Sequence, residues 1–511
     1  MINITNNEIK FNDLEEKMWK KKMQEGLDEL RDQLRRIDYQ LLKNRNNELL
    51  EPKDFQSTTI KCRFGDLDIN RRRYKLKKNN NEVEWVYLLD IYLELGYSGE
   101  YSQSIVEMVL KEATEKSYRK TAETIEKNTN VSISHTTARK ILIDFSENRI
   151  EKIEKEKLKL YEKGYIEGTK ELKIIYEESD GIFISKQNRK KNKEARKGKK
   201  LKNEIKIGIV HEGFEKRYSK DFKVKNKQMI ATTRSAKYFK RLVDMTIGTT
   251  YKESSIEKII INADGAGWCK DIAESPKERY QLDMFHIQKK ISEAVTDIEY
   301  KKLMSGIVKT DKPEEIFSII YNYKVELEYD KNDDELSKVK ELEEYLRNNK
   351  KGLLRYQYEL GLTKEEIEKL DETEYRNLGT EESQVYSGCR KRMKRNRTSW
   401  SDRGSEAMVK VISYIKSNIL EDLITGKMKK AIDKELKERM NFIDLSLIEQ
   451  PKEETLTLKD YKLFSNMLKT ILENNGSNNL KVSEILDKAL LTRYSLEEYS
   501  KFEKILNSCL N

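Results

Sequence analysis

The chain of 511 residues is 37% hydrophobic, which supports roughly two to four domains with their own cores and excludes a disordered protein. Another 37% of the residues are charged, and the excess of Lys and Arg, 101 against 90 Asp and Glu, gives a net charge of +11. This excess favours a polyanionic partner, although a lysine-rich solvated surface would give the same total.

The sequence also bears on compartment and redox state. No run approaches the roughly 18 apolar residues of a membrane span, and Met1–Lys10 lacks the apolar core of a signal peptide. We therefore expect a soluble, cytoplasmic protein without a membrane partner. The four cysteines are far apart and form no Cys-x-x-Cys pair, so reduced thiols are expected in place of a zinc knuckle or a disulfide framework.

One long amphipathic helix dominates the first expected domain, residues 1–56. From Met23 onward the apolar residues follow at steps of three and four, the spacing of a coiled-coil seam: Leu27, Leu30, Leu34, Ile37 and Leu41. The pattern spans fewer than about three heptads, so packing on the chain itself and pairing with a second copy both stay open. A homo-oligomer is thus left open.

Residues 57–100 are expected to hold a β-hairpin and a connector. Within Thr58–Lys77 the apolar residues alternate on either side of Gly65-Asp66, which predicts two short strands about a turn. The second strand ends in the basic cluster Arg71-Arg72-Arg73-Tyr74. These arginines could lie on phosphates, but a solvated strand end is the commoner explanation.

Three helical patterns between Gln103 and Phe145 place a helix-turn-helix in residues 101–165. The last two are separated by the short polar segment Asn128–Ser132. The final helix has an apolar face formed by Ala138, Ile141, Leu142 and Phe145. Its opposite face offers side chains that can reach base edges and phosphates: His135, Thr136, Thr137, Arg139 and Lys140. Helical hairpins with a polar face also occur in proteins that never touch DNA, so both interpretations stay open.

A change from helical to strand patterns marks residues 166–296 as a core with a mixed sheet. The expected elements are a first strand around Lys173–Ile184 with Asp180 within or beside it, strands at Glu204–His211 and Tyr218–Val224, a helix at Ser235–Thr249, and a strand at Lys258–Ala263. Three neighbouring strands, a crossover helix and another strand is the order of a ribonuclease-H-like sheet. In that order the first and fourth strands are neighbours, so Asp180 and Asp264 would meet.

The stretch Ile259–Trp268 ends its apolar run at Asp264 and then turns at Gly265 and Gly267. An acid at the exit of a buried strand is a candidate metal ligand. Alone, the pattern fits equally well a cap for a helix that begins near Trp268.

The strongest charge asymmetry of the chain lies inside this core, at Lys186–Lys202. The segment has one acid, Glu194, among ten basic residues, which include Lys190, Lys191, Arg196, Lys197, Lys199 and Lys200. Runs of like charge are usually solvated. Because this run lies between two strands beside the proposed carboxylates, a nucleic-acid-binding loop is favoured.

The remainder of the chain reads as mostly helical. Residues 297–372 are expected to form a helical insertion, 373–420 a returning segment that supplies a third acid, Glu382, and 421–511 further helices. The returning segment also holds the basic stretch Arg390–Arg395. The whole chain is thus expected to be α+β and largely helical.

Three acids on separate elements are what two-metal phosphoryl transfer requires. Hard cations such as Mg²⁺ or Mn²⁺ take carboxylate and water oxygens, and two ions would activate the attacking oxygen and stabilise the leaving one. With only three His and no Cys cluster, a zinc site is disfavoured.

The sequence resembles the ISLre-type transposases of bacterial insertion sequences, a family long catalogued as uncharacterised and related to Mutator-like transposases. The motifs that carry the resemblance occur in the family's order: Phe64-Gly65-Asp66 with Arg71–Tyr74, Ser117-Tyr118-Arg119, Val131–Thr137, Ser179-Asp180-Gly181, Ala263–Trp268, Leu282–His286, Glu382-Ser383, Arg392-Met393-Lys394 and Trp400-Ser401. This chain lacks the Cys-pair motif found near the N-terminus of family members.

The resemblance implies a DDE transposase in which Asp180, Asp264 and Glu382 bind metal. Glu381 is the alternative third acid. Asp283 and His286 match the Asp-x-x-His signature of Mutator-like relatives, although Asp283 could instead cap the next helix and His286 be a buried imidazole. Arg392 and Lys394 are expected to contact DNA.

The leading hypothesis is a transposase that binds the terminal repeats of its element and the target DNA, both double-stranded, at the bacterial nucleoid. Water would free a 3′-hydroxyl, which then attacks target DNA. A non-catalytic DNA-binding protein, either a degraded transposase or a repressor, is the alternative. A nuclease acting on RNA is a third reading that leaves the order of the motifs unexplained.

Overall fold

The computed structural model divides into two compact units, each described here by itself. Unit 1 comprises Met1–Met108, Ala122–Ile133 and Met428–Asn511, and unit 2 comprises Val109–Thr121 and Ser134–Lys427. The structure describes residues 10–77, 83–93, 100–187, 201–216, 222–265, 267–270, 275–368, 377–379, 386–394 and 398–424. Within these stretches no helix is both long and apolar enough to cross a membrane.

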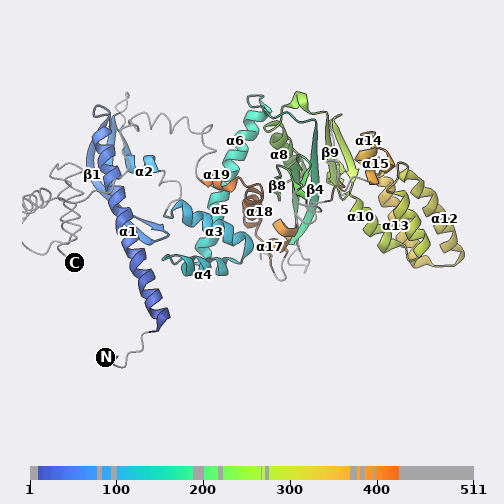
Figure 1. Cartoon of the computed structure of the whole chain (residues 1–511), viewed down its shortest axis with the longest axis horizontal. Coiled ribbons are helices and arrows are strands. Elements are labelled where there is room, and N and C mark those ends of the chain that lie inside the picture. The colour runs from blue at the N-terminus through green and yellow to red at the C-terminus, as the bar shows by residue number, and fades with distance from the viewer. Residues whose placement is uncertain are drawn as a thin grey trace, which may run out of the picture. The chain divides into compact units, whose positions relative to one another are not determined.

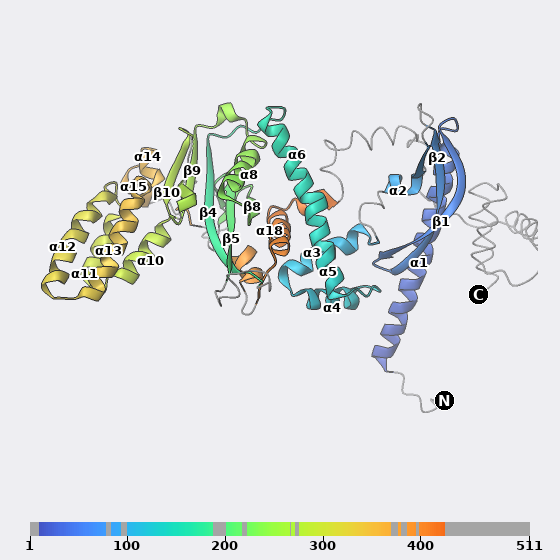
Figure 2. The same cartoon turned by 180° about the vertical axis from the view of Figure 1, so that it is seen from behind.

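Unit 1 is built around a three-stranded antiparallel sheet in the order β1-β2-β3 (Figure 2). Its elements are α1 (Phe11–Asn44), β1 (Leu50–Cys62), β2 (Gly65–Lys77), β3 (Val83–Tyr87) and α2 (Leu88–Leu93). The predicted hairpin is present, but each strand has 13 residues and a third strand joins it. Helices α3 (Gln103–Glu115) and α4 (Tyr118–Asn128) contribute residues to both units.

The leucine seam of α1 packs on the hairpin of its own chain. Leu27, Leu34 and Leu41 are buried in one core with Leu67 and Tyr74 of β2. Burial of such side chains contributes about 1.5–3 kcal/mol each. These leucines therefore belong to the hydrophobic core of unit 1.

The basic cluster Arg71–Arg73 lies within β2, which continues to Lys77, and it is engaged inside unit 1. Each guanidinium pairs with an acid, Arg71 with Asp90, Arg72 with Asp38 and Arg73 with Asp54. Each also lies 4.3–4.5 Å from the centre of an aromatic ring. Burial raises the pKa of Asp38 to about 6, while Arg72 opposes that shift. The cluster thus fits neither an open phosphate-binding patch nor a solvated strand end.

Unit 2 contains a five-stranded mixed sheet in the order β10-β9-β4-β5-β8 (Figures 1 and 2). The strands are β4 (Ile174–Ser185), β5 (Lys202–His211), β8 (Gln228–Thr232), β9 (Lys258–Ala263) and β10 (Glu278–Leu282). Strands β4, β9 and β10 are parallel, whereas β5 runs antiparallel to both β4 and β8. The expected side-by-side placement of the first and fourth strands is confirmed, with β9 beginning and ending as predicted.

The expectation for the third strand was wrong. Phe222–Val224 forms β7, which pairs with β6 (Phe214–Lys216) in a separate two-stranded hairpin. The third strand of the sheet is β8, whose Met229, Ile230 and Ala231 are buried. A short apolar run gives no periodic signal that shows whether it joins the main sheet or a separate hairpin.

Alternation along β4 divides its side chains between the two faces of the sheet. Ile175 packs in the core formed with α8 (Ala236–Gly248), whereas Tyr176 packs with Tyr356 on the other face. Because the side chains of a strand alternate with a period of two, Glu178 and Asp180 share the face of Tyr176. Asp180 therefore lies on the face opposite α8.

Glu177 is fully buried, and this burial raises the pKa of its carboxyl to about 7. The folded state consequently holds the proton more tightly than the unfolded chain. The stabilisation that the proton on Glu177 gives to the folded state is complete below the ordinary carboxyl pKa. It is lost as the pH rises through about 7. A shift of this size corresponds to about 3 kcal/mol.

Replacing Glu177 by Gln should remove this pH dependence. Gln keeps an acceptor for the Ser179 hydroxyl, which donates to Glu177 Oε1 at 2.8 Å. Between pH 5 and pH 8 the free energy of unfolding of E177Q should rise by about 3 kcal/mol relative to wild type. Denaturant titrations at both pH values measure this difference. The exposed-site variant E314Q is the control, and equal shifts in both variants would contradict the assignment.

Three helices cover the β8 side of unit 2. They are α5 (His135–Phe145), α6 (Glu151–Glu162) and α18 (Asp402–Lys416), with the π-turn η2 (Ser146–Ile150) between the first two. Helix α18 packs on both β8 and α5. Glu406 of α18 accepts hydrogen bonds from the Thr232 hydroxyl at 2.8 Å and the Thr233 N–H at 2.6 Å. The fully buried Lys410 donates to Glu154 of α6 at 2.7 Å.

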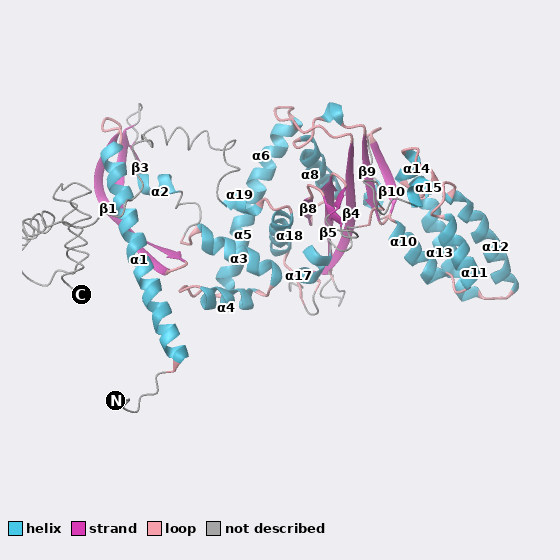
Figure 3. Cartoon of the chain, viewed as in Figure 1, coloured by secondary structure: helices cyan, strands magenta, loops and turns pink. Residues whose placement is uncertain are grey.

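A group of helices follows β10 at the other edge of the sheet (Figure 3). They are α10 (Met284–Ala294), α11 (Ile298–Ile307), α12 (Ile316–Tyr329), α13 (Asp333–Asn348), α14 (Tyr356–Glu359) and α15 (Lys364–Glu368). Tyr280 and Leu282 of β10 share a core with them.

Several short elements complete the description of unit 2. They are η3 (Glu253–Ser255), α9 (Gly267–Lys270), η4 (Pro313–Glu315), η5 (Lys350–Gly352), η7 (Tyr386–Arg390), α17 (Lys391–Met393) and α19 (Leu420–Ile424).

Candidate active site

The parallel register of β4 and β9 places two predicted acids side by side. Ser179 and Ala263 are paired across the two strands, and Asp180 and Asp264 are the next residues. Gly265 follows with φ +86°, a left-handed conformation that glycine adopts without strain and that turns the chain away from the strand. The two carboxylates are therefore delivered to one place by backbone geometry.

The carboxyl of Asp180 is held in a charged and largely buried environment. Its Oδ1 accepts a hydrogen bond from the Gly181 N–H at 2.7 Å, and Arg390 Nη2 lies 3.8 Å from its Oδ2. Burial, followed by repulsion from Asp264, raises the pKa of Asp180, while Arg390 and the Gly181 N–H oppose the shift. The position accumulates negative charge that a cation would stabilise.

Asp283 and His286 lie beside this pair. Because the Asp283 N–H donates to the Ala263 carbonyl at 2.8 Å, the end of β10 is fixed at the end of β9. The Asp283 carboxylate caps α10 by accepting the His286 N–H at 3.0 Å, as the helix-cap interpretation predicted. It also lies 3.2 Å from His286 Nδ1. This contact is the main cause that raises the pKa of His286, and the charges of Asp264 and Asp180 add to it.

Buried polar side chains support Asp283 from behind. Asn262 Nδ2 donates to Asp283 Oδ1 at 3.0 Å, and Gln281 Nε2 donates to Asn262 Oδ1 at 3.1 Å. The Tyr356 N–H donates to Gln281 Oε1 at 2.8 Å. Asp283 is fully buried, so this chain of hydrogen bonds fixes its position. We call Asp180, Asp264, Asp283 and His286 the carboxylate site.

A second buried pair reaches the returning segment. Glu178 Oε1 lies 3.1 Å from His211 Nε2, and both side chains are fully buried. The other oxygen, Oε2, accepts the Gly379 N–H at 2.8 Å. A Cβ on Gly379 would lie 3.5 Å from Asp283 Oδ1. Residues 377–379 are thus anchored next to the carboxylate site.

The third predicted acid, Glu382, and its alternative, Glu381, lie outside the described residues. Of the described residues on either side of them in the chain, Arg390 contacts Asp180 of the carboxylate site, and Gly379 donates to Glu178, which stands two positions before Asp180 on β4. Within the described ranges, no group of three or more His, Cys, Asp and Glu side chains is arranged to hold a metal ion.

The predicted DNA-contacting residues fall into three classes. On α5, His135, Thr136, Arg139 and Lys140 are exposed and Thr137 is half-buried, whereas Ala138, Ile141 and Leu142 are buried. Lys394 is exposed, but Arg392 is only 5% exposed and donates through Nε to the Ala113 carbonyl at 2.7 Å. The predicted residues of the basic segment, Lys190, Lys191, Arg196, Lys197, Lys199 and Lys200, lie outside the described part of the chain.

Two neighbours of the site were missed by the sequence analysis. Glu178 stands two positions before Asp180, so strand alternation alone could have placed it on the same face. Arg390 was noticed only as part of a basic stretch. Its contact with Asp180 depends on how residues 386–394 return to the sheet, and no local sequence pattern predicts the course of the chain there.

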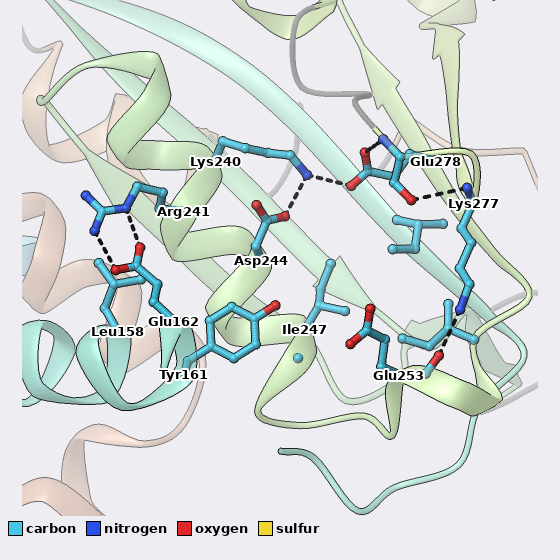
Figure 4. A pocket seen from close by; sticks show the side chains of 14 residues that line it. Leu158, Tyr161, Glu162, Lys240, Arg241, Asp244, Ile247, Glu253, Lys277 and Glu278 are labelled. Carbon is cyan, nitrogen blue, oxygen red and sulfur yellow. Dashed lines mark hydrogen bonds and ion pairs between the residues drawn. The ribbon is translucent and has the colours of Figure 1, made fainter. Parts of the chain in front are cut away.

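A cavity of about 410 Å³ lies on the α8 side of the sheet, lined in part by α6 and α8 (Figure 4). Its charged side chains largely pair with one another. Lys240 contacts both Asp244 and Glu278, and Arg241 donates to Glu162 at 2.6 Å. These ion pairs indicate a structural role.

Comparison with known proteins places the chain in a family. The profile of the Uncharacterised protein family (UPF0236) matches residues 4–431. The chain belongs to this family. A UPF0236 protein of Caldanaerobacter subterraneus subsp. tengcongensis is 25% identical over 467 residues, which cover 88% of this chain and 87% of the relative. The UPF0236 protein TTE2489 of the same strain is 24% identical over 465 residues, 88% of each chain.

The name of the first relative joins eleven locus designations of one strain. A third relative, 24% identical over 403 residues that cover 76% of this chain and 75% of its own, carries four. The family description itself assigns no activity.

Proposed function

We propose that this UPF0236 protein is the transposase of a bacterial insertion sequence, which binds terminal repeats and catalyses metal-dependent DNA cleavage and strand transfer. The observation that carries the proposal is the parallel register of β4 and β9, which brings Asp180 and Asp264 together at neighbouring positions. Acids on adjacent strands of a mixed sheet are the arrangement that the family resemblance predicts.

The strand order supports a ribonuclease-H-like core. Numbered along the chain, the sheet has three antiparallel strands, β4, β5 and β8, then helix α8, then β9 and β10 parallel to β4. The first strand is central and neighbours the fourth, as in that fold. The predicted helix-turn-helix, with α5 as the DNA-reading helix, belongs to the same proposal.

The donor chemistry fits two hard divalent cations, Mg²⁺ or Mn²⁺. Asp180 and Asp264 offer carboxylate oxygens, and their mutual repulsion contributes to the raised pKa of Asp180. Glu382, carried over from the family motif, would complete the set. Bound ions of this kind would supply charge stabilisation for phosphoryl transfer.

The neighbouring residues would orient the acids and balance their charge. Asp283 holds His286 beside Asp180 and Asp264, and a raised pKa keeps His286 protonated to higher pH than usual. Arg390 adds a positive charge 3.8 Å from Asp180. Both cations lie where the negatively charged backbone of a DNA strand would approach.

Two further observations favour mobile DNA as the substrate. The exposed face of α5 carries Arg139 and Lys140, and the chain as a whole has a charge of +11. A relative whose one name covers eleven loci of a single strain is what an element that copies itself would leave behind. The protein would then act on double-stranded DNA at the nucleoid, in the cytoplasm, with a homo-oligomer as one possible working form.

The test uses full-length protein and a supercoiled plasmid that carries the element with its native flanking DNA. With Mg²⁺, strand breaks should map to the element ends, and a target plasmid should acquire insertions. Binding to the ends without any cleavage in Mg²⁺ or Mn²⁺ would overturn the proposal in favour of a non-catalytic DNA-binding protein. Cleavage of RNA but not of DNA would favour a ribonuclease.

A further inference from the structure

A second cavity, of about 350 Å³, lies within unit 2 where α5, α17 and the N-terminus of α18 meet. Its lining includes Tyr118, Arg139, Arg392, Trp400, Ser401 and Gly404. The lining residues carry two positive charges and no carboxylate. We call this cavity the Arg139 pocket.

The guanidinium of Arg392 gives the inner wall of the Arg139 pocket a fixed positive charge. Arg392 is almost fully buried, and its guanidinium lies 4.9 Å from the centre of the Trp400 ring and 5.5 Å from that of Tyr118. Trp400 is held in turn, because its Nε1 donates to the Met393 carbonyl at 3.0 Å. A buried guanidinium held by aromatic rings favours an anion in the space beside it.

The opposite wall joins Arg139 to the start of a 15-residue helix. Arg139 Nη2 lies 3.3 Å from the hydroxyl of Ser401, which caps α18 by accepting the Gly404 N–H at 3.1 Å. A Cβ on Gly404 would lie 2.9 Å from the Ser401 hydroxyl and 3.6 Å from Arg139 Nη2. A helix N-terminus favours anions, and the glycine leaves room beside it.

Tyr118, one of the residues that line the Arg139 pocket, carries an unused donor. Among the described residues, the Tyr118 hydroxyl is buried and has no hydrogen-bond partner. Burial raises the pKa of Tyr118, so the hydroxyl keeps its proton and can donate. A buried donor without a partner costs about 1–3 kcal/mol, a cost that an acceptor oxygen in the pocket would offset.

The surroundings connect the Arg139 pocket to the predicted DNA-binding segments. Arg139 belongs to the exposed face of α5. Gln187, which also lines the pocket, follows Lys186 at the start of the basic segment, and its N–H donates to the Trp400 carbonyl at 2.9 Å. Asp402, the first residue of α18, is paired with Lys186 at 2.8 Å, which neutralises the nearby carboxylate.

We propose that the Arg139 pocket binds one phosphate group of the DNA backbone, contacted by Arg139, the Tyr118 hydroxyl and the N-terminus of α18. The inference rests on the proposed function only in taking DNA as the ligand. It does not depend on cleavage. A phosphate contact positions α5 on the duplex without reading sequence.

The test measures binding of full-length protein to a duplex of about 30 base pairs with arbitrary sequence, over a range of salt concentrations. R139Q should bind about tenfold more weakly, and the slope of log affinity against log salt should decrease by about 1. G404A should also weaken binding, although it changes no charge. Y118F should bind about threefold more weakly and should fold at least as stably, because it removes an unpaired buried donor.

K302Q is the matched control, because Lys302 is exposed on α11 and its replacement removes the same charge elsewhere. Its affinity and salt slope should equal those of wild type. Equal slopes for R139Q and wild type would overturn the proposal. The proposal would also be overturned if R139Q lost affinity only for duplexes that contain element ends, since Arg139 would then read bases.

Inorganic phosphate distinguishes a free phosphate ligand from the DNA backbone. At millimolar concentration it should compete with the duplex for wild type more than for R139Q, when chloride of equal ionic strength is the reference. If phosphate raised the melting temperature of wild type but not of R139Q while both bound the duplex equally, the pocket would belong to a small phosphate compound. The proposal would then be wrong, although cleavage at the element ends could still be observed.

Discussion

Replacing Asp264 by Asn is expected to reduce metal-dependent cleavage at the element ends by at least about 100-fold while DNA binding is retained. The substitution keeps the size of the side chain but removes the charge that lies next to Asp180, where β9 ends beside the middle of β4. A neutral amide is a poor ligand for a hard divalent cation, so the loss should appear in the rate of cleavage and not in the affinity for DNA. Plasmid cleavage and duplex binding measure the two effects separately.

Glu257 provides a matched control at the other end of β9. It precedes β9 at the end opposite Asp264, and its exposed carboxylate pairs with Lys173 at 2.8 Å. E257Q removes the same charge as D264N and should cleave DNA like wild type. Full activity of a correctly folded D264N, or an equal loss in both variants, would refute the assignment of Asp264.

Replacing Lys410 by Met should destabilise unit 2 by about 3–5 kcal/mol, the largest effect on stability that we expect from one substitution. Lys410 is fully buried in α18, and its ammonium group donates to the buried Glu154 of α6 at 2.7 Å. The pKa of Lys410 is raised because attraction by Glu154 and Glu406 outweighs the opposing effect of burial. Methionine would leave Glu154 buried without this counter-charge. Equilibrium unfolding in denaturant measures the difference.

An exposed ion pair between α18 and η2 serves as the control. Arg403 of α18 pairs with Glu147 of η2, and the Arg403 side chain is 60% exposed. R403M should destabilise the protein far less than K410M, because exposed pairs contribute little. The double variant K410M/E154L should recover most of the lost stability, since it leaves no charge buried. If K410M and R403M were equally stable, Lys410 and Glu154 would not act as a buried pair.

Much of the sheet could be predicted because its strands carry local signals. The three successive isoleucines before Asn262 predicted a strand buried on both faces, and β9 has the predicted bounds. The parallel neighbour relation between β4 and β9 followed from the expected strand order and placed Asp180 beside Asp264. The leucine spacing of α1 likewise predicted the helix, although only the structure assigned its apolar face to the hairpin of the same chain.

The parts that could not be predicted depend on contacts between distant segments. Arg390 reaches Asp180, and Gly379 reaches Glu178, only because the chain returns to the sheet after the helices that follow β10. The arginines after Ile69 had no sequence signal for their acidic partners, which come from α1, β1 and α2. The third strand was placed at Tyr218–Val224 and not at Gln228–Thr232, because both runs are short and periodicity does not rank such runs.

The cover that α18 gives to β8 has a consequence for how the chain folds during synthesis. The Thr232 hydroxyl contacts Glu406 across 174 residues, and Lys410 contacts Glu154 across 256. The ribosome makes the chain in order from the N-terminus. Strand β8 and Glu154 of α6 are therefore made long before Glu406 and Lys410 of α18, and they stay without these partners until most of unit 2 has been synthesised. An unpaired strand edge and an uncompensated buried acid make such a nascent intermediate prone to aggregation. Chains that stop short of α18 should therefore be poor candidates for partly active fragments, and a complete unit 2 is the smallest piece expected to persist in a cell.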